Sequence, residues 1–306
     1  MGFFSRFPAG AVLDEVQNVP DLFSYLQVRI DEAPQGPKWV LTGSQQIDLV
    51  RGVTQSLAGR VALLELLPFS YAELQGAPRR PLTLVDAVLA GGYPPLFDST
   101  RKLPPGRWLD DYLATFVNRD VRNLLDVRDR SGFDRFVRLC AARSGQILNV
   151  ADLSRDGGVS HKTASAWLSV LEACYLIRLV RPHHENFGKR MIKSPKLFFL
   201  DSGLACRLLG ITTAHQLRLY PLWGALADLL IESGNALIPI ECKATESPAP
   251  SEAKSIRHLR TLSQQRGNTI VSPGMIVYAG HESRVSGEDR FVPWNSIDNA
   301  VLASVG

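Results

Sequence analysis

Three short apolar runs, each followed by polar residues, constrain the fold of this chain most strongly. They lie within residues 11–15, 38–44 and 61–69, and the segments between them can form helices. Strands that alternate with helices are typical of an α/β protein with a parallel sheet. The pattern therefore predicts strands at these three positions and helices between them.

Polar side chains follow the first two runs. Asp14 and Glu15 end the first, and Thr42 and Ser44 end the second. The carboxyl ends of neighbouring parallel strands meet at one edge of a sheet, where α/β proteins bind ligands. There Asp14 can coordinate Mg²⁺, Glu15 can polarise an attacking water, and a hydroxyl such as that of Ser44 can contact a phosphate. Arg60 can stabilise transferred charge. Alternatively, Asp14 and Glu15 only cap the following helix.

Composition sets the class of protein. The chain has 306 residues, 45% of them apolar and 21% charged, which is typical of a globular protein with two or three domains. A net charge of +4 is too small to indicate nucleic-acid binding by itself. The four cysteines are widely separated, and no apolar run has the roughly 18 residues of a membrane helix. We expect a cytoplasmic protein without a membrane partner.

The middle of the chain has helical spacing. A helix is expected within residues 80–97, ended by Gly91-Gly92 and Pro94-Pro95, and further helices within residues 108–142. Residues 147–180 then suggest a helix, a glycine-containing turn, a second helix and a strand, the order of a winged helix-turn-helix. Ser160 suits the N-cap of the second helix, which places His161 and Lys162 where a recognition helix contacts a DNA groove. Alternatively, this unit only packs against its neighbours.

The most basic stretch of the chain follows this unit. It includes Lys189, Arg190 and Lys193. A surface that tracks nucleic-acid phosphates has this character, and so does an ordinary solvated loop.

The C-terminal part returns to strand-like runs at residues 236–244, 275–280 and 290–294. Residues 228–244 suggest a β-hairpin with a Ser-Gly-Asn turn. Asp228 opens its first strand, and Glu241 and Lys243 lie two residues apart on the second, hence on one face. Two carboxylates can bind Mg²⁺ while the lysine supports the water that attacks a phosphodiester. These residues therefore predict a magnesium-dependent, nuclease-like site.

Several long motifs carry a family resemblance. AVLDEVQNVPDLFSYLQ, KWVLTGSQQIDLV, SLAGRVALLELLPFSYAEL and KRMIKSPKLFFLDSGLACRLLGI resemble prokaryotic AAA-type ATPases that carry domain of unknown function 4143. The resemblance implies ATP and Mg²⁺ as cofactors. It also implies an α/β fold with a partial P-loop AAA-type sheet at 1–75, a helical lid-like region at 76–146, a winged helix-turn-helix at 147–220 and an incomplete restriction-endonuclease-like domain at 221–306.

The chain departs from this family at two places. It contains no G-x-x-x-x-G-K-[ST] motif to hold phosphates, and only a few residues join Trp223 to Asp228 where the family has a longer segment. We therefore expect an N-terminally truncated or relic ATPase with impaired or absent hydrolysis. Alternatively, the protein binds nucleic acid through its winged helix and carries a degenerate magnesium-dependent nuclease-like domain. The expected partners are DNA, a second copy or a partner ATPase.

Overall fold

The computed structural model describes part of the chain and divides it into two compact units. The described residues are 3–33, 36, 38–43, 57–74, 76–101, 103–116, 129–181, 194–220, 229–233, 236–243, 245–254, 256–257, 270–271, 274–297 and 300. The first unit consists of Met1–Leu67 and Leu168–Leu176, and the second of Pro68–Trp167 and Ile177–Gly306.

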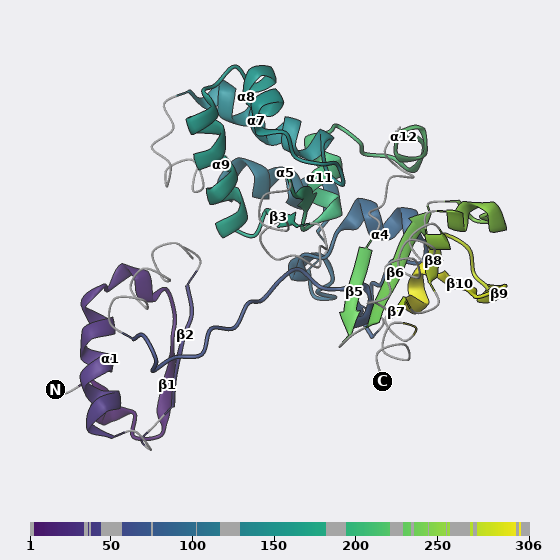
Figure 1. Ribbon diagram of the computed structural model, residues 1–306. Helices are drawn as coiled ribbons and strands as arrows, with labels where there is room; N and C mark the ends of the chain where they lie inside the picture. Colours follow the sequence, from purple (N-terminus) through teal and green to yellow (C-terminus); the bar gives the residue numbers. More distant parts are fainter. Residues whose placement is uncertain are drawn as a thin grey trace. The chain divides into compact units, whose positions relative to one another are not determined.

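The first unit contains a strand-helix-strand arrangement. Strand β1 (Gly10–Leu13) pairs in parallel with β2 (Lys38–Leu41), from Gly10 opposite Lys38 to Leu13 opposite Leu41. Helix α1 (Asp21–Glu32) connects the strands and lies alongside them (Figure 1). Short 3-10 turns occur at Phe4–Arg6 and Val16–Asn18. The first two predicted strands and their parallel order are confirmed.

A small apolar core holds α1 against the strands. Phe23 and Leu26 of the helix pack with Val16 and Leu57. Removing such side chains from water is the main force that fixes the helix to one face of the strand pair.

The third predicted strand is wrong. Residues 61–69 have no strand pairing in the part of the chain that the structure describes, and Leu64 and Leu66 are 92% and 93% exposed. A β-strand requires a neighbour to accept and donate its backbone hydrogen bonds. The apolar pattern of this run was recognised correctly, but it did not reveal whether a partner strand lies beside it.

Helices form most of the second unit before the final sheet. They are α3 (Tyr71–Leu74), α4 (Leu84–Ala90), α5 (Pro105–Tyr112), α7 (Arg130–Ala142), α8 (Val150–Gly157), α11 (Ser202–Leu208) and α12 (Ala214–Leu219), with a 3-10 turn at Pro94–Leu96. Helix α9 (His161–Ala173) begins in this unit, and its residues from Leu168 on belong to the first unit. Thr83 caps the start of α4 by accepting a hydrogen bond from the Asp86 amide at 3.1 Å. Gly91 ends that helix with a φ of 70°. The helix predicted within residues 80–97 is therefore confirmed.

Two of these helices and a strand follow one another in the order that the sequence predicts, and a second strand pairs with the first. The side chain of Asn149 caps α8, Gly158 ends it in a left-handed conformation, and the Ser160 hydroxyl accepts a hydrogen bond from the Thr163 amide at 3.1 Å. Strands β3 (Ile177–Val180) and β4 (Lys196–Phe199) then pair antiparallel. The prediction of Ser160 as the N-cap of α9 is confirmed.

The last part of the second unit is a mixed sheet. Its strands are β5 (Leu229–Ser233), β6 (Ala236–Lys243), β7 (Ile270–Val271), β8 (Met275–Tyr278), β9 (Arg284–Ser286) and β10 (Asp289–Pro293). Their order is β5-β6-β8-β10-β9, and β7 also pairs with β6 (Figure 1). Strands β5 and β6 form an antiparallel hairpin, whereas β6, β8 and β10 run parallel. The predicted hairpin and the predicted strands near 275 and 290 are confirmed. Short 3-10 turns occur at Pro250–Ala253 and Trp294–Ser296.

Helix length and composition bear on the predicted lack of a membrane partner. Across the described part of the chain, the helices are too short or too polar to cross a bilayer.

Candidate functional site

The carboxyl ends of β1 and β2 bring together two of the residues that the sequence singles out. The backbone pairing continues past the strands, because the Thr42 amide donates to the Leu13 carbonyl at 2.9 Å and the Val16 amide donates to the Thr42 carbonyl at 3.2 Å. This pairing sets Asp14 beside Thr42, and the Thr42 hydroxyl donates a hydrogen bond to Asp14 Oδ1. Both side chains are exposed at this edge. A ligand can therefore reach them.

Glu15 adopts an unusual backbone conformation next to Asp14. Its φ is 53° and its ψ is 41°, in the left-handed region that side chains other than glycine rarely occupy. Its amide donates to Asp14 Oδ1 at 3.0 Å, which holds the carboxylate on the side of the turn. Such conformations cost about 1 kcal/mol or more and are concentrated at functional sites.

The donor atoms at this edge fit a hard cation. Asp14 and Glu15 offer carboxylate oxygens and Thr42 a hydroxyl oxygen, the ligand type that Mg²⁺ prefers. Among the described residues there is no group of three or more His, Cys, Asp or Glu side chains arranged to hold a metal. Proteins commonly hold Mg²⁺ with one or two carboxylates, the other ligands being water and phosphate oxygens. The edge thus has the composition of a partial magnesium site.

Arg60 lies away from Asp14. Its Nε and Nη2 atoms bind both carboxylate oxygens of Asp31 at 2.5 and 2.9 Å. Helix α1 begins after the carboxyl end of β1 and ends before the amino end of β2, so Asp31 in its last turn lies near the opposite edge of the strand pair. The hydrogen bonds from Arg60 lower the pKa of Asp31. The structure therefore does not bring Arg60 together with Asp14.

Glu241 and Lys243 lie on one face of β6, as predicted. Lys243 Nζ is 2.6 Å from Glu241 Oε1, and Glu241 is only 5% exposed. Its other oxygen, Oε2, is buried without a hydrogen-bond partner in the described structure. Pairing with Ile276 on β8 places Glu241 on the same face as a core cluster that includes Ile276, Tyr278 and Phe291. A buried carboxylate with one unsatisfied oxygen can accept a further donor or a cation.

The predicted nucleic-acid contacts are only partly described. His161 and Lys162 are exposed in the first turn of α9. Val180 pairs with Lys196, so the basic stretch forms the connection between β3 and β4. Five predicted site residues lie outside the described residues: Ser44, Lys189, Arg190, Lys193 and Asp228.

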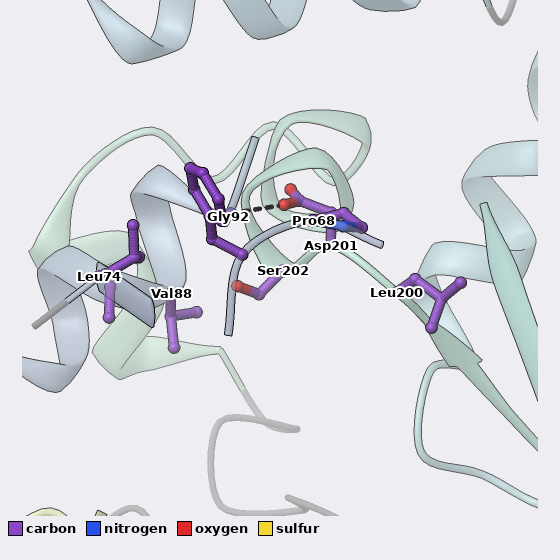
Figure 2. Close-up of a pocket in the computed structure, with 10 residues that line it drawn as sticks. Pro68, Leu74, Val88, Gly92, Leu200, Asp201 and Ser202 are labelled. Carbon is purple, nitrogen blue, oxygen red and sulfur yellow. Dashed lines mark hydrogen bonds between the residues drawn. The ribbon is translucent and has the colours of Figure 1, made fainter. Parts of the chain in front are cut away.

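Sequence patterns assign no role to Asp201, although this acid follows the apolar run of β4. It is 3% exposed, and it accepts hydrogen bonds from the amide of Gly92, shown in Figure 2, and from the amide of Leu204, each at 2.7 Å. The Gly92 carbonyl in turn accepts a hydrogen bond from the Phe69 amide at 2.7 Å. The acid at the end of an apolar run was the visible signal. The contact with Gly92 could not be read from the sequence because the two residues are 109 positions apart, whereas the contact with Leu204, three residues on, is that of an ordinary helix N-cap.

Comparisons with known families match two segments of the chain. Residues 3–75 match a family described as "AAA domain", and residues 82–215 match one described as "Domain of unknown function (DUF8612)". The first segment contains Asp14, Glu15 and Thr42. Neither match is to domain of unknown function 4143 or to a restriction-endonuclease-like domain, so both of these stay predictions.

Two curated relatives are similar over the same extent. They are the uncharacterized proteins Rv2008c of Mycobacterium tuberculosis and Mb2031c of Mycobacterium bovis. Each is 34% identical over 213 residues, which is 70% of this chain and 47% of the relative. The chain thus spans about half the length of these relatives. No solved structure matches it. The chain therefore resembles AAA domains in its first part and a domain of unknown function in its middle.

Proposed function

We propose that this protein is an ATP-binding protein of the AAA type whose Mg²⁺ is held at the carboxyl ends of β1 and β2. The observation that carries the proposal is the hydrogen bond from Thr42 to Asp14 across two parallel strands. The AAA-domain match over residues 3–75 supports it, because the same strands lie inside that match.

Each side chain at this edge has a distinct role in the proposal. Asp14 binds Mg²⁺ directly or through water, and Thr42 orients the Asp14 carboxylate. Glu15 is the base that orients a water for attack on the terminal phosphate. Bound Mg²⁺ would neutralise charge on the phosphate oxygens. The left-handed backbone at Glu15 fixes the direction in which its side chain leaves the turn after β1.

Hydrolysis by these 306 residues alone is proposed to be impaired or absent. The sequence contains no G-x-x-x-x-G-K-[ST] motif, so it lacks the amides and the lysine that hold the β- and γ-phosphates. Asp14 can contact a metal, but a triphosphate would have few other partners in this chain. We expect weak nucleotide binding that depends on Mg²⁺.

Nucleotide titration tests this proposal. The full chain is titrated with a fluorescent ATP analogue, with and without Mg²⁺, beside Asp14→Asn and Glu15→Gln variants. We expect binding that requires Mg²⁺ and is lost in Asp14→Asn, whereas Glu15→Gln binds normally. Equal binding by the wild type and Asp14→Asn would refute a metal-ligand role for Asp14. Asp21→Asn, a change at an exposed acid in the first turn of α1, is the matched control.

A second candidate function is nucleic-acid binding through a winged helix. The order of α8, α9 and the β3–β4 hairpin favours it, with the exposed His161 and Lys162 at the start of α9. In this proposal the basic connection, with Lys189, Arg190 and Lys193, contacts phosphates.

A degenerate nuclease-like site would accompany that function. Glu241 and Lys243 form a close pair with one carboxylate oxygen unsatisfied, which supports a site that also includes Asp228. Fluorescence anisotropy with duplex DNA at several salt concentrations tests the binding. A steep loss of affinity with salt, reduced in Lys162→Ala, is expected, and absence of binding at low salt would exclude this function. Mg²⁺-dependent cleavage that survives Lys243→Ala would contradict the nuclease assignment.

A further inference from the structure

A cavity in the second unit combines an apolar wall with one buried acid. Its volume is about 170 Å³, and it lies among α3, α4 and the start of α11. Leu74 and Val88 line one side, and Asp201 and Ser202 face them across the cavity (Figure 2). Ala87 adds to the apolar wall. A ligand in this space would meet hydrocarbon on one side and a carboxylate on the other.

Backbone donors fix the Asp201 carboxylate in position. The Gly92 amide donates to Oδ2 and the Leu204 amide to Oδ1, each at 2.7 Å. A side chain at position 91 would clash, because a Cβ atom on Gly91 would lie 2.3 Å from Asp201 Oδ1. The end of α4 at Gly91 and Gly92 thus packs directly against the Asp201 carboxylate. This rigid setting preorganises the carboxylate for a ligand.

The charge of Asp201 has no counter-ion among the described residues. The hydrogen bonds that it accepts come from backbone amides, and none of the residues lining the cavity is basic. Burial raises the pKa of Asp201 despite those amides, so the ionised form costs free energy in the folded protein. Capping a helix does not require a charge, because Asn and Ser cap about as well as Asp. The charge therefore suits a cation that enters the cavity from outside.

The size and lining of the cavity define the class of cation. At about 30 Å³ of liquid volume per water, a cavity of about 170 Å³ holds roughly five or six non-hydrogen atoms. The apolar wall suits a short methylene chain rather than a hydrated metal ion. We propose that this cavity binds an alkylammonium group, with Asp201 as its counter-ion and the Leu74, Ala87 and Val88 side chains against its methylenes.

Two sources can supply this group: a free small amine, or the side chain of a lysine on a partner protein. Both present an ammonium at the end of about four methylenes. The test therefore uses n-butylammonium as the free amine and Nα-acetyl-lysine N-methylamide as the peptide form.

Amide NMR shifts of the full chain provide the readout. Gly92 and Leu204 donate directly to Asp201, so their amide signals should shift and saturate as n-butylammonium is added, with millimolar affinity for so small a ligand. Neutral n-butanol, which has the same methylenes but no charge, should bind at least tenfold more weakly. Sodium chloride at equal concentration controls for ionic strength.

Three variants distinguish the contribution of the Asp201 carboxylate to binding from that of the apolar wall of the cavity. Asp201→Asn should weaken binding at least tenfold. Ala87→Leu should block binding by filling the apolar side, and it does not alter the acid, so it decides the question if Asp201→Asn does not fold. Asp86→Asn, a change at an exposed acid on α4, is the matched control and should bind as the wild type does.

The outcomes distinguish the sources and the proposal itself. Binding of both ligands assigns the cavity to a partner's lysine, and binding of n-butylammonium alone assigns it to a free amine. Absence of saturable shifts with either ligand overturns the proposal. Unchanged affinity in both Asp201→Asn and Ala87→Leu overturns it as well.

Discussion

The hydroxyl of Thr42 donates a hydrogen bond to the carboxylate of Asp14 and so links the carboxyl ends of two parallel strands. Through this hydrogen bond, Thr42 holds the carboxylate of Asp14, the candidate metal ligand, in one orientation. Partners of this kind commonly change metal affinity by 10- to 100-fold when they are removed.

Thr42→Val removes the hydroxyl donor while keeping a β-branched side chain. We expect Mg²⁺ affinity to fall roughly tenfold, because Asp14 loses the bond that orients it. Thr42→Ser retains the hydroxyl and should keep most of the affinity. Isothermal titration with Mg²⁺ in the presence of ATP measures both. Equal affinities in Thr42→Val and the wild type would show that Thr42 does not orient a metal ligand.

The ion pair of Arg60 and Asp31 should contribute a small, pH-dependent stability. Arg60 lowers the folded pKa of Asp31 below its usual 3.8, so the contribution is present above pH 3.8. It is lost as the pH falls through the lower, folded value. Asp31→Asn should remove this dependence and reduce stability slightly at pH 7, as expected for an exposed pair. Urea unfolding of the wild type and Asp31→Asn at pH 7 and pH 3 measures the effect. If Asp31→Asn lost more stability at pH 3 than at pH 7, this expectation would be contradicted.

Lys243 stabilises a buried charge. Lys243→Met leaves Glu241 without its cation, and we expect the free energy of unfolding to fall by about 2 kcal/mol. This is less than the usual cost of breaking a fully buried pair, because the Lys243 side chain is 27% exposed. Adding Glu241→Leu to this variant should restore most of the lost stability, because both charges are then removed. Urea unfolding of the two single variants and the double variant gives the coupling free energy. Additive losses would show that the pair does not interact.

Asp201 should make the protein less stable as the pH rises. Its folded pKa is raised above the unfolded value of 3.8, so between these two values the unfolded chain loses its proton first. Stability therefore falls across that window and stays constant above it. Asp201→Asn should abolish this fall. Urea unfolding between pH 3.5 and pH 7 measures it, and an identical pH profile in the variant would show that Asp201 does not titrate in this window.

Local patterns in the sequence predicted the paired elements well. Alternation of apolar and polar runs located β1, β2 and the β5–β6 hairpin. The Gly91-Gly92 and Pro94-Pro95 stop signals located α4, and the Ser160 cap located the start of α9. The spacing of Glu241 and Lys243 correctly placed both on one face of β6. These features depend on residues that are close in the chain, so a single sequence reveals them.

Contacts between distant residues could not be predicted in this way. The apolar character of residues 61–69 suggested a strand, but strand formation requires a neighbour that the sequence does not identify. The sequence did not reveal the ion pair of Arg60 with Asp31, 29 residues earlier, and the expected role of Arg60 in stabilising transferred charge stays a prediction. The Asp201 carboxylate binds the Gly92 amide 109 residues away, and the sequence offered no sign of that pairing.

Paramagnetic broadening by Mn²⁺ tests the central claim most directly. Mn²⁺ replaces Mg²⁺ at oxygen sites and broadens the NMR signals of nearby amides. We predict that low concentrations of Mn²⁺ with ATP broaden the amide signals of Asp14, Glu15 and Thr42 first, and that Asp14→Asn abolishes this selective broadening. Uniform broadening across the chain, or the same pattern in Asp14→Asn, would contradict a metal site at the carboxyl ends of β1 and β2.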